Sequence, residues 1–136
     1  MMYLLDTNVI SELRKSNANL NVLNWISKIP EQQIYLPSIV IMEIEIGILR
    51  IERKDAHQGK ILRSWFEHQV VPEFKDRILS VNYSVARHCA KLHVPNPKSE
   101  RDAWIAAIAM ANNLAVVTRN TKDFVDIDVN LINPWV

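Results

Sequence analysis

Short apolar runs alternate along this chain with longer segments in which apolar residues recur at helical spacing. The apolar runs predict five buried strands, at residues 2–5, 34–36, 78–81, 115–118 and 129–132. Strands that alternate with helices are typical of a parallel sheet covered by helices on both faces. We therefore predict an α/β fold of three layers, α/β/α, around a five-stranded parallel sheet.

The segments between these strands predict helices. They are expected from after Asp6 to about Lys15, over 20–26, from Ser38, over 55–70, over 83–92 and over 101–112. The segment after Ser38 is ambiguous, because its isoleucines alternate with other residues at the period of a strand. Ser38 as an N-cap and the length of the run favour a helix. The last helix is apolar on nearly all sides, so we expect it at the centre of the fold.

Composition limits the class of protein. The chain has 136 residues, of which 49% are hydrophobic, so we expect one domain over residues 1–136 with a proper core. A formal net charge of +1 means that any phosphate contact must come from a local cluster. The single cysteine, Cys89, excludes a disulfide framework. Asp6 interrupts the first apolar run and no run suits a membrane helix, so we expect a cytoplasmic protein.

Four carboxylates occur where apolar segments begin, end or are interrupted: Asp6, Glu43, Asp102 and Asp123. An ionised carboxylate in apolar surroundings is costly unless it is paired or binds a cation. Four of them indicate a hard metal ion, Mg²⁺ or Mn²⁺, held by oxygen ligands. In parallel sheets the ligand site lies beyond the carboxyl ends of the strands, where Asp6 and Asp123 are expected.

The residues around these acids resemble the four motifs of PIN-domain nucleases of the VapC and FitB toxin type. The matching segments are Tyr3–Leu13, Ser38–Gly47, Asp102–Ala107 and Val117–Phe124, and the ending Asn133-Pro134-Trp135 also resembles that family. One motif alone would be weak, because an Asp-Thr-Asn tripeptide is common. Four motifs in the same order across the whole chain are specific.

The resemblance implies a metal-dependent endoribonuclease that acts as the toxin of a type II toxin–antitoxin pair and inhibits translation. Carried over by motif, the catalytic residues and metal ligands are the four acids named above, and the supporting residues are Asn8, Thr118 and Asn120. The implied partners are a cognate antitoxin, an RNA substrate with tRNA favoured over rRNA, and operator DNA reached only through the antitoxin. A homodimer is also implied.

The expected chemistry is an in-line displacement by a hydroxide that the metal makes available near neutral pH. Asp6 would be the principal ligand, and the other three acids would complete one or two metal sites. No serine, histidine and aspartate set stands out, and the four histidines lie outside the motifs. The predicted products therefore carry a 5′-phosphate and a 3′-hydroxyl.

Each acid also has a structural alternative. Asp6 can cap the first helix, Asp102 can be an acid of a helix N-terminus, and Asp123 can be a turn residue. Glu43 can be a solvated helix residue. Glu45 competes with Glu43, but two residues of a helix point about 200° apart, so only one can face the site. The motif spacing selects Glu43.

The loop before the third motif departs from the turn that is usual in the family. Its residues 94–101 bring Glu100 and Arg101 next to Asp102. Two hypotheses follow from this crowding. Glu100 joins the acidic site, or Arg101 pairs with Asp102 and weakens metal binding.

Other function classes fit less well. A phospho-acceptor receiver domain needs a pair of acids after its first strand and a lysine after its last, and a haloacid-dehalogenase-type phosphatase needs Asp-x-Asp where this chain has Asp6-Thr7-Asn8. The remaining alternative is a catalytically weak PIN-like protein that binds its antitoxin and regulates transcription. No motif acid is missing, which argues against it.

Two helices are expected to offer more apolar surface than a small domain needs, at residues 20–26 and 61–70. This surface predicts a homodimer with a groove for an amphipathic antitoxin segment, whose basic residue would insert among the carboxylates. Trp65 and Phe66 are expected in the core.

Overall fold

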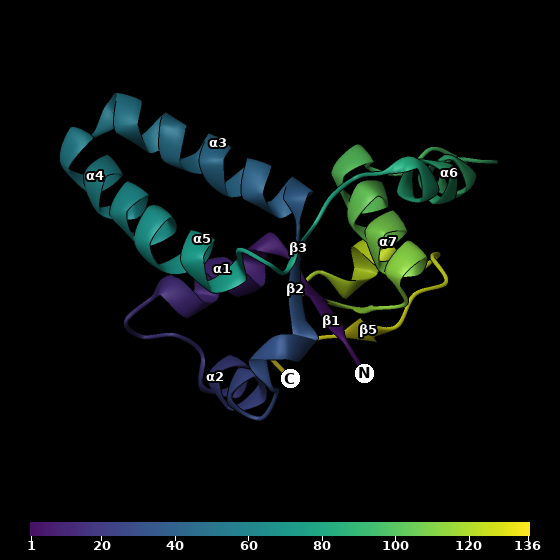
Figure 1. The fold of residues 1–136 in the computed structure, drawn as a ribbon, viewed down its shortest axis with the longest axis horizontal. Helices are drawn as coiled ribbons and strands as arrows, with labels where there is room; N and C mark the ends of the chain where they lie inside the picture. Colours follow the sequence, from purple (N-terminus) through teal and green to yellow (C-terminus); the bar gives the residue numbers. More distant parts are fainter.

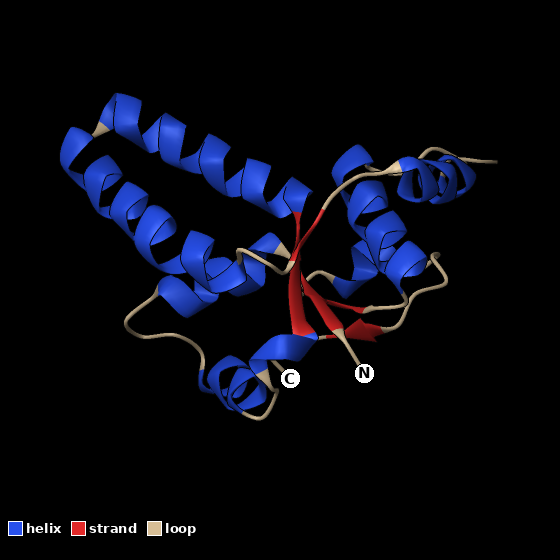
Figure 2. Ribbon diagram, viewed as in Figure 1, coloured by secondary structure: helices blue, strands red, loops and turns tan.

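A five-stranded parallel sheet forms the middle layer of the computed structural model, which describes residues 1–136 (Figures 1 and 2). Its strands are β1 (Tyr3–Leu5), β2 (Ile34–Pro37), β3 (Ile78–Leu79), β4 (Ala115–Val117) and β5 (Leu131–Ile132). The strand order is β3-β2-β1-β4-β5, so the first strand is central and the chain winds outwards from it in both directions. All four strand pairs are parallel, as the alternation of strands and helices predicts.

Helices cover both faces of this sheet. They are α1 (Thr7–Arg14), α2 (Leu20–Ser27), α3 (Ser38–Lys54), α4 (Ala56–Trp65), α5 (Val71–Phe74), α6 (Tyr83–Leu92) and α7 (Glu100–Asn112). Short 3₁₀ turns occur at Glu31–Gln33 and at Thr121–Phe124, and a π turn at Phe66–Val70 joins α4 to α5. In Figure 1, α3, α4 and α5 lie on one side of the strands and α6 and α7 on the other. The predicted three-layer arrangement is confirmed.

The core lies along the central strands and α7. Leu4, Leu5 and Val116 are fully buried, because a parallel strand in the middle of such a sheet is covered on both faces. In α7, Ala103 and the residues from 105 to 109 are buried, which confirms that this helix is central. No helix of the structure is both long enough and apolar enough to cross a membrane.

Local details differ from the sequence prediction at the ends of elements. The segment after β2 is a helix, with Ile44 and Ile48 buried at a spacing of one turn, but Ser38 does not cap it: Pro37 holds the N-cap position and no side chain caps the helix. The strands predicted at 78–81 and 129–132 shorten to two residues each.

The helix predicted over 55–70 is also interrupted. It begins at Ala56, where the Asp55 carboxylate accepts a hydrogen bond from the Gln58 N–H at 3.1 Å, and its last turn is the π turn. Phe66 and Val70, at the two ends of this turn, are both buried in the core. Phe66 is therefore a core residue, as predicted, whereas Trp65 is only half-buried.

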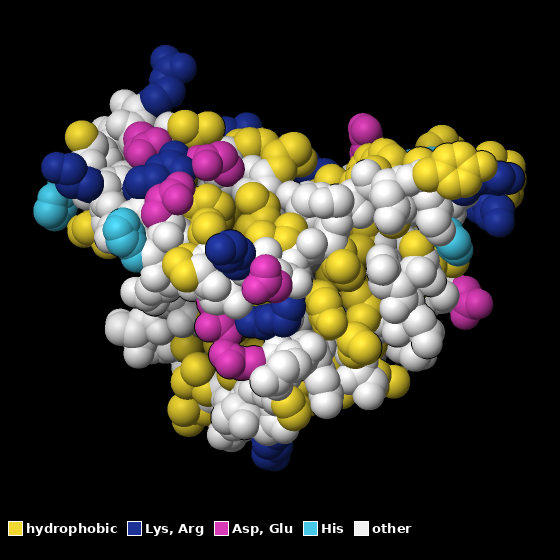
Figure 3. Space-filling view, viewed as in Figure 1, with side chains coloured by type: hydrophobic (Ala, Val, Ile, Leu, Met, Phe, Trp, Pro, Cys, Tyr) yellow, Lys and Arg dark blue, Asp and Glu magenta, His cyan; other side chains and the backbone are white.

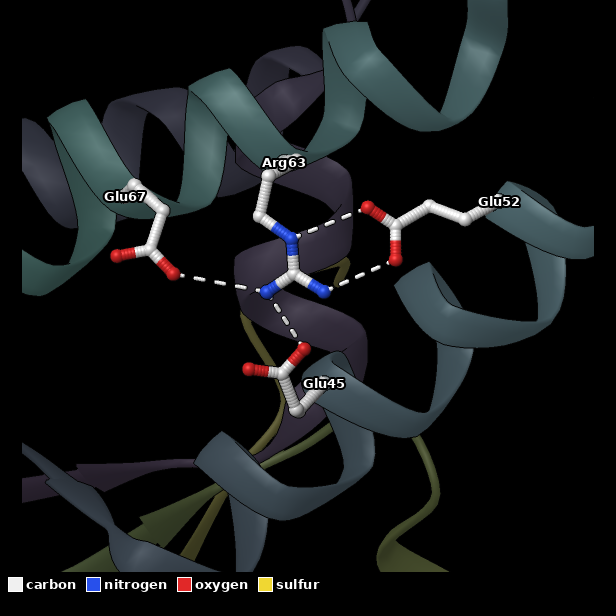
Figure 4. A network of polar contacts seen from close by, with 4 residues as sticks. All are labelled: Glu45, Glu52, Arg63 and Glu67. Atoms are coloured by element: carbon white, nitrogen blue, oxygen red, sulfur yellow. Dashed lines mark hydrogen bonds and ion pairs between the residues drawn. The ribbon is translucent and has the colours of Figure 1, made fainter. Parts of the chain in front are cut away.

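The helices α3 and α4 form a tightly packed antiparallel hairpin. Arg63 on α4 contacts Glu45 at 2.6 Å and Glu52 at 3.1 Å, both on α3, and Glu67 at 3.5 Å in the π turn (Figure 4). A Cβ atom at Gly59 would lie 2.7 Å from the Cα of Glu52, so glycine is the residue that fits this approach. Charged side chains of both signs are interleaved over this end of the molecule (Figure 3, upper left).

Candidate active site

Asp6 is fixed at the carboxyl end of the central strand. Its backbone N–H donates to the carbonyl of Val117 at 2.9 Å, which extends the pairing of β1 with β4 by one residue. Its Oδ1 accepts the N–H of Thr7 at 2.7 Å, so Asp6 is itself the N-cap of α1. Asp6 therefore does cap the first helix, as the structural alternative predicts, but it uses only one of its two carboxylate oxygens to do so.

The second oxygen of Asp6 is held by the residues expected to support it. The Thr118 hydroxyl donates to Oδ2 at 2.8 Å, and the side-chain amide of Asn8 donates to Oδ2 at 3.4 Å and to the Thr118 hydroxyl at 3.3 Å. The N–H of Asn120 donates to the same hydroxyl at 3.0 Å. Thr118 is fully buried and Asp6 is 7% exposed, so these polar groups depend on one another.

Glu43 on α3 is linked to Asp6 through Thr7, the residue that follows Asp6 in the chain. The Thr7 hydroxyl donates to Glu43 Oε1 at 2.9 Å, and the Arg101 guanidinium lies 3.6 Å from Oε2. Glu45 points instead towards α4, where it pairs with Arg63 (Figure 4). The helix therefore presents Glu43, and not Glu45, to the end of the central strand, as the angular argument requires.

Asp102 lies in the first turn of α7 and belongs to the same electrostatic group. Burial raises the pKa of Asp102 above its usual value, and the charges of Asp123, Asp6 and Glu43 raise it further, against a hydrogen bond from Ser99. Burial also raises the pKa of Asp6, and Asp123 adds to this shift, although hydrogen bonds from Thr118, Thr7 and Asn8 oppose it. The four acids thus repel one another across the end of the sheet.

Asp123 comes from the 3₁₀ turn after β4. Its N–H donates to the carbonyl of Asn120 at 3.0 Å, and the next residue, Phe124, is fully buried and anchors the turn. The side chain of Asp123 itself is exposed, so among the four acids it has the most freedom to move.

The two residues before Asp102 lie elsewhere than proposed. Arg101 pairs with Glu43, and no contact joins it to Asp102. Glu100 lines a cavity of about 380 Å³ between α6 and α7, and its charge adds to the burial that raises the pKa of the Cys89 thiol. Glu100 also lines a second cavity, with Ile39 and Met42 of α3, and it is two residues and about 200° away from Asp102 on the same helix.

A divalent cation suits these acids by chemistry and charge, although its coordination shell is not preformed. No three His, Cys, Asp or Glu side chains stand in position to hold a metal ion. The donors are all carboxylate oxygens, which hard cations prefer. The acids repel one another, and Arg101 is the one cationic side chain that forms an ion pair with any of them. The site therefore keeps negative charge that a cation would neutralise.

Two further residues take part that the sequence did not single out for function. The Thr7 hydroxyl links the Asp6 turn to Glu43, and Ser99 opposes the rise in the pKa of Asp102. Thr7 stands inside the first motif, and Ser99 precedes the last predicted helix at a position where serine is common. Both signals were present, but neither identifies the acid that the hydroxyl contacts.

Comparison with known proteins matches this arrangement to a family. The family model of the PIN domain matches residues 3–130. Toxin FitB of Neisseria gonorrhoeae is 34% identical to this chain, and the alignment covers 98% of the chain and 99% of FitB. VapC ribonuclease Y4jK of Sinorhizobium fredii is 32% identical, with 98% of each protein covered.

A solved structure agrees over the same length. The crystal structure of FitAcB from Neisseria gonorrhoeae superposes with a TM-score of 0.90 at 32% identity, covering 98% of this chain and 99% of the matched one. The fold therefore agrees over nearly the whole length of both chains. The chain belongs to the PIN-domain family.

Proposed function

We propose that this protein is a divalent-metal-dependent endoribonuclease that acts as the toxin of a toxin–antitoxin pair. The observation that carries the proposal is the group of four acids at the end of the sheet, where burial first, and then the charge of neighbouring acids, raises the pKa of Asp6 and of Asp102. The names of two relatives support the assignment, since FitB is called a toxin and Y4jK a VapC ribonuclease.

In this proposal Asp6, Glu43, Asp102 and Asp123 hold Mg²⁺ or Mn²⁺, directly or through water. A bound divalent ion supplies positive charge for the phosphodiester and lowers the pKa of a water molecule towards neutrality. The chain's own contribution is to orient the acids. Thr7, Asn8 and Thr118 hold both oxygens of Asp6 before any substrate arrives, so Asp6 is fixed while the other acids must move closer to complete a coordination shell.

The histidines support this choice over metal-free cleavage. His57 lies on α4, His68 in the π turn, His88 on α6 and His93 at its C-cap, and none hydrogen-bonds an acid of the site. A ribonuclease that uses the ribose 2′-hydroxyl needs such a general base beside the phosphate. We expect hydrolysis by water, which leaves a 5′-phosphate and a 3′-hydroxyl.

The products test this mechanism directly. EDTA should stop cleavage, and Mg²⁺ or Mn²⁺ should restore it. A substrate with 2′-deoxyribose at the scissile nucleotide should still be cut. Ends that carry a 2′,3′-cyclic phosphate, or cleavage in excess chelator, would refute the mechanism.

The substrate is proposed to be a structured RNA, with tRNA favoured over rRNA. Sequencing of RNA ends after induction of the protein tests this choice. Induction of Asp6→Asn is the matched control, because it keeps the shape of the side chain and removes the charge that a hard cation needs. New ends that appear only with the wild-type protein identify the target, and ends confined to rRNA would overturn the preference.

The proposed partners are an antitoxin and a second copy of this chain. Leu20 on α2 is 74% exposed and Ile61 on α4 is 50% exposed, so both apolar side chains are available to a partner. A cavity of about 520 Å³ runs along α4, lined by His57, Lys60, Ile61, Ser64, Trp65 and Gln69. It suits an amphipathic antitoxin segment, and operator DNA would be reached through that antitoxin.

Two measurements test these partners. Analytical ultracentrifugation of the isolated protein at micromolar concentration should show a dimer, and a monomer would contradict the homodimer. Ile61→Glu should weaken the binding of the antitoxin while RNA cleavage by the free protein persists. Unchanged antitoxin binding would place the groove elsewhere.

A catalytically weak protein is the second candidate, and one contact favours it. Arg101 lies 3.6 Å from Glu43 and already supplies positive charge to the acids. If this contact blocks the cation, the protein binds its antitoxin without cleaving RNA. Equal growth inhibition by wild type and by Asp6→Asn would support this candidate and refute the enzyme.

A further inference from the structure

Residues 133–135 lie against the turn that follows β4. The Arg119 guanidinium stands over the ring of Trp135, with its Cζ 5.4 Å from the ring centre. The side-chain amide of Asn133 also approaches the carbonyl of Arg119 at 3.5 Å. The charge of Arg119 also helps to lower the pKa of Glu12, but no ion pair within 4.0 Å joins the two side chains, so the Trp135 ring is the direct contact of the guanidinium.

Trp135 is itself held in place from two sides. Its N–H donates to the Asn133 side-chain oxygen at 2.9 Å, which closes a local turn around Pro134. Its carbonyl accepts the side-chain amide of Asn21, on α2, at 2.8 Å. The ring beneath Arg119 therefore belongs to a segment that is tied back to the body of the protein.

Arg119 connects this segment to the acids through its backbone. The Arg119 N–H donates to the side-chain oxygen of Asn8 at 3.2 Å. This hydrogen bond fixes the oxygen of the planar Asn8 amide. The amide nitrogen on the opposite side of the plane then points towards Asp6 Oδ2 and the Thr118 hydroxyl. The contacts thus form a series from Trp135 to Arg119, then to Asn8, and then to Asp6.

We propose that Trp135 and Arg119 are positioning residues for the acidic site, acting on Asp6 through the orientation of Asn8. This inference rests on the proposed ribonuclease function. Neither residue touches the acids, so its loss should lower the rate of cleavage at saturating RNA and leave RNA binding unchanged. A purely structural role for Trp135 would reduce stability without changing the rate of the folded protein.

The test compares Trp135→Ala and Trp135→Phe with a matched control, Tyr83→Ala. Tyr83 also carries a guanidinium over its ring, that of Arg87 at 5.7 Å, but on α6 and without contact to the acids. Two quantities are measured on full-length protein below its unfolding temperature. They are hydrogen exchange of the Arg119 amide by NMR, and initial rates on total tRNA with Mg²⁺ at low and at saturating RNA.

Trp135→Ala should speed exchange of the Arg119 amide and lower the saturated rate by about tenfold, as loss of a supporting contact typically does. Trp135→Phe should restore both, because a phenyl ring still supports the guanidinium. Tyr83→Ala should change neither. Unchanged exchange, or an unchanged saturated rate, in folded Trp135→Ala would overturn the inference.

The proposed ribonuclease function and the proposed positioning role can be refuted separately. If wild-type protein cleaves no RNA under any metal condition, the proposed function fails, and the positioning role for cleavage fails with it. If wild-type protein cleaves RNA and Trp135→Ala cleaves equally well, only the positioning role fails.

Discussion

Two regions of this molecule gather carboxylates, and they treat the negative charge in opposite ways. On the α3–α4 hairpin, Glu45, Glu52 and Glu67 surround Arg63, and hydrogen bonds to Glu52 and Glu45 raise the pKa of that guanidinium above its usual value (Figure 4). At the end of the sheet the acids repel one another, and the pKa of Asp6 and of Asp102 is raised.

The difference lies in the built-in counter-charge. A guanidinium offers several N–H donors in a fixed plane, so one arginine can serve three carboxylates at once. The acids of the sheet edge share only the longer contact from Arg101 to Glu43. A count of acidic residues therefore does not identify a cation site, whereas gathered acids that lack a resident cation do indicate one.

The largest expected effect comes from removing a charge at the sheet edge. Asp6→Asn keeps the side-chain shape, so circular dichroism should show an unchanged fold, while RNA cleavage and growth inhibition should be abolished because a hard cation loses its principal ligand. Full toxicity of Asp6→Asn would show that these acids have no catalytic role.

The next effect separates the two regions along a single helix. Glu43→Gln should lower the rate of cleavage by roughly 10-fold to 100-fold, the range found for groups that support a metal site. Glu45→Gln is the matched control, two residues away, and it should leave the rate nearly unchanged because Glu45 faces Arg63. The reverse order of the two rates would show that α3 presents its other face to the site.

On the hairpin the same kind of experiment should change stability instead of activity. Arg63→Met removes the shared cation and leaves three carboxylates close together, so the free energy of unfolding should fall, by a small amount because the group is partly exposed and solvent screens it. Urea unfolding measures this loss, and cleavage at low temperature should remain normal. A loss of cleavage without a loss of stability would remove the distinction between the two regions.

The smallest effect is a pH dependence at Asp102. Because burial and the neighbouring acids raise its pKa in the folded protein, the folded state binds protons more tightly than the unfolded state, whose value is about 3.9. Ionisation of Asp102 therefore costs stability as the pH rises from the unfolded value through the raised folded value. Without divalent ions, Asp102→Asn should be more stable than wild type at pH 7 by less than about 1 kcal/mol.

Urea unfolding of both proteins between pH 3 and pH 7 measures this difference, with the pH range chosen to span the ordinary carboxyl pKa and its raised value. The advantage of Asp102→Asn should be smallest at the acid end and should grow as the pH rises. An advantage that does not change with pH would mean that Asp102 carries no electrostatic cost in the folded protein.

Much of the fold, and the position of several acids within it, could be predicted from the sequence. The alternation of strands and helices indicated the parallel sheet, and the ends of the first and fourth strands placed Asp6 beside Asp123, because such ends meet at one edge. The angle between two residues of a helix predicted that either Glu43 or Glu45 turns away, and the spacing of the second motif selected Glu43 as the one that faces the site. These inferences depend on backbone geometry, which repeats from protein to protein.

Other contacts depend on tertiary packing and could not be predicted locally. Arg101 is next to Asp102 in the chain but reaches Glu43, because α3 begins near the first turn of α7. The π turn after Trp65 and the missing cap at Ser38 also follow from packing, which overrides the local pattern. The partners of Arg63 lie on three elements, so periodicity could not identify them.

The position of β1 between β2 and β4 has a consequence during protein synthesis. The partners of Asp6, Val117 and Thr118, are translated more than a hundred residues after it. A nascent chain that ends before β4 cannot complete the hydrogen bonds of Asp6, whatever it has folded. The acidic site therefore assembles only after β4 has left the ribosome, and translation products that end before β4 should lack the proposed ribonuclease activity.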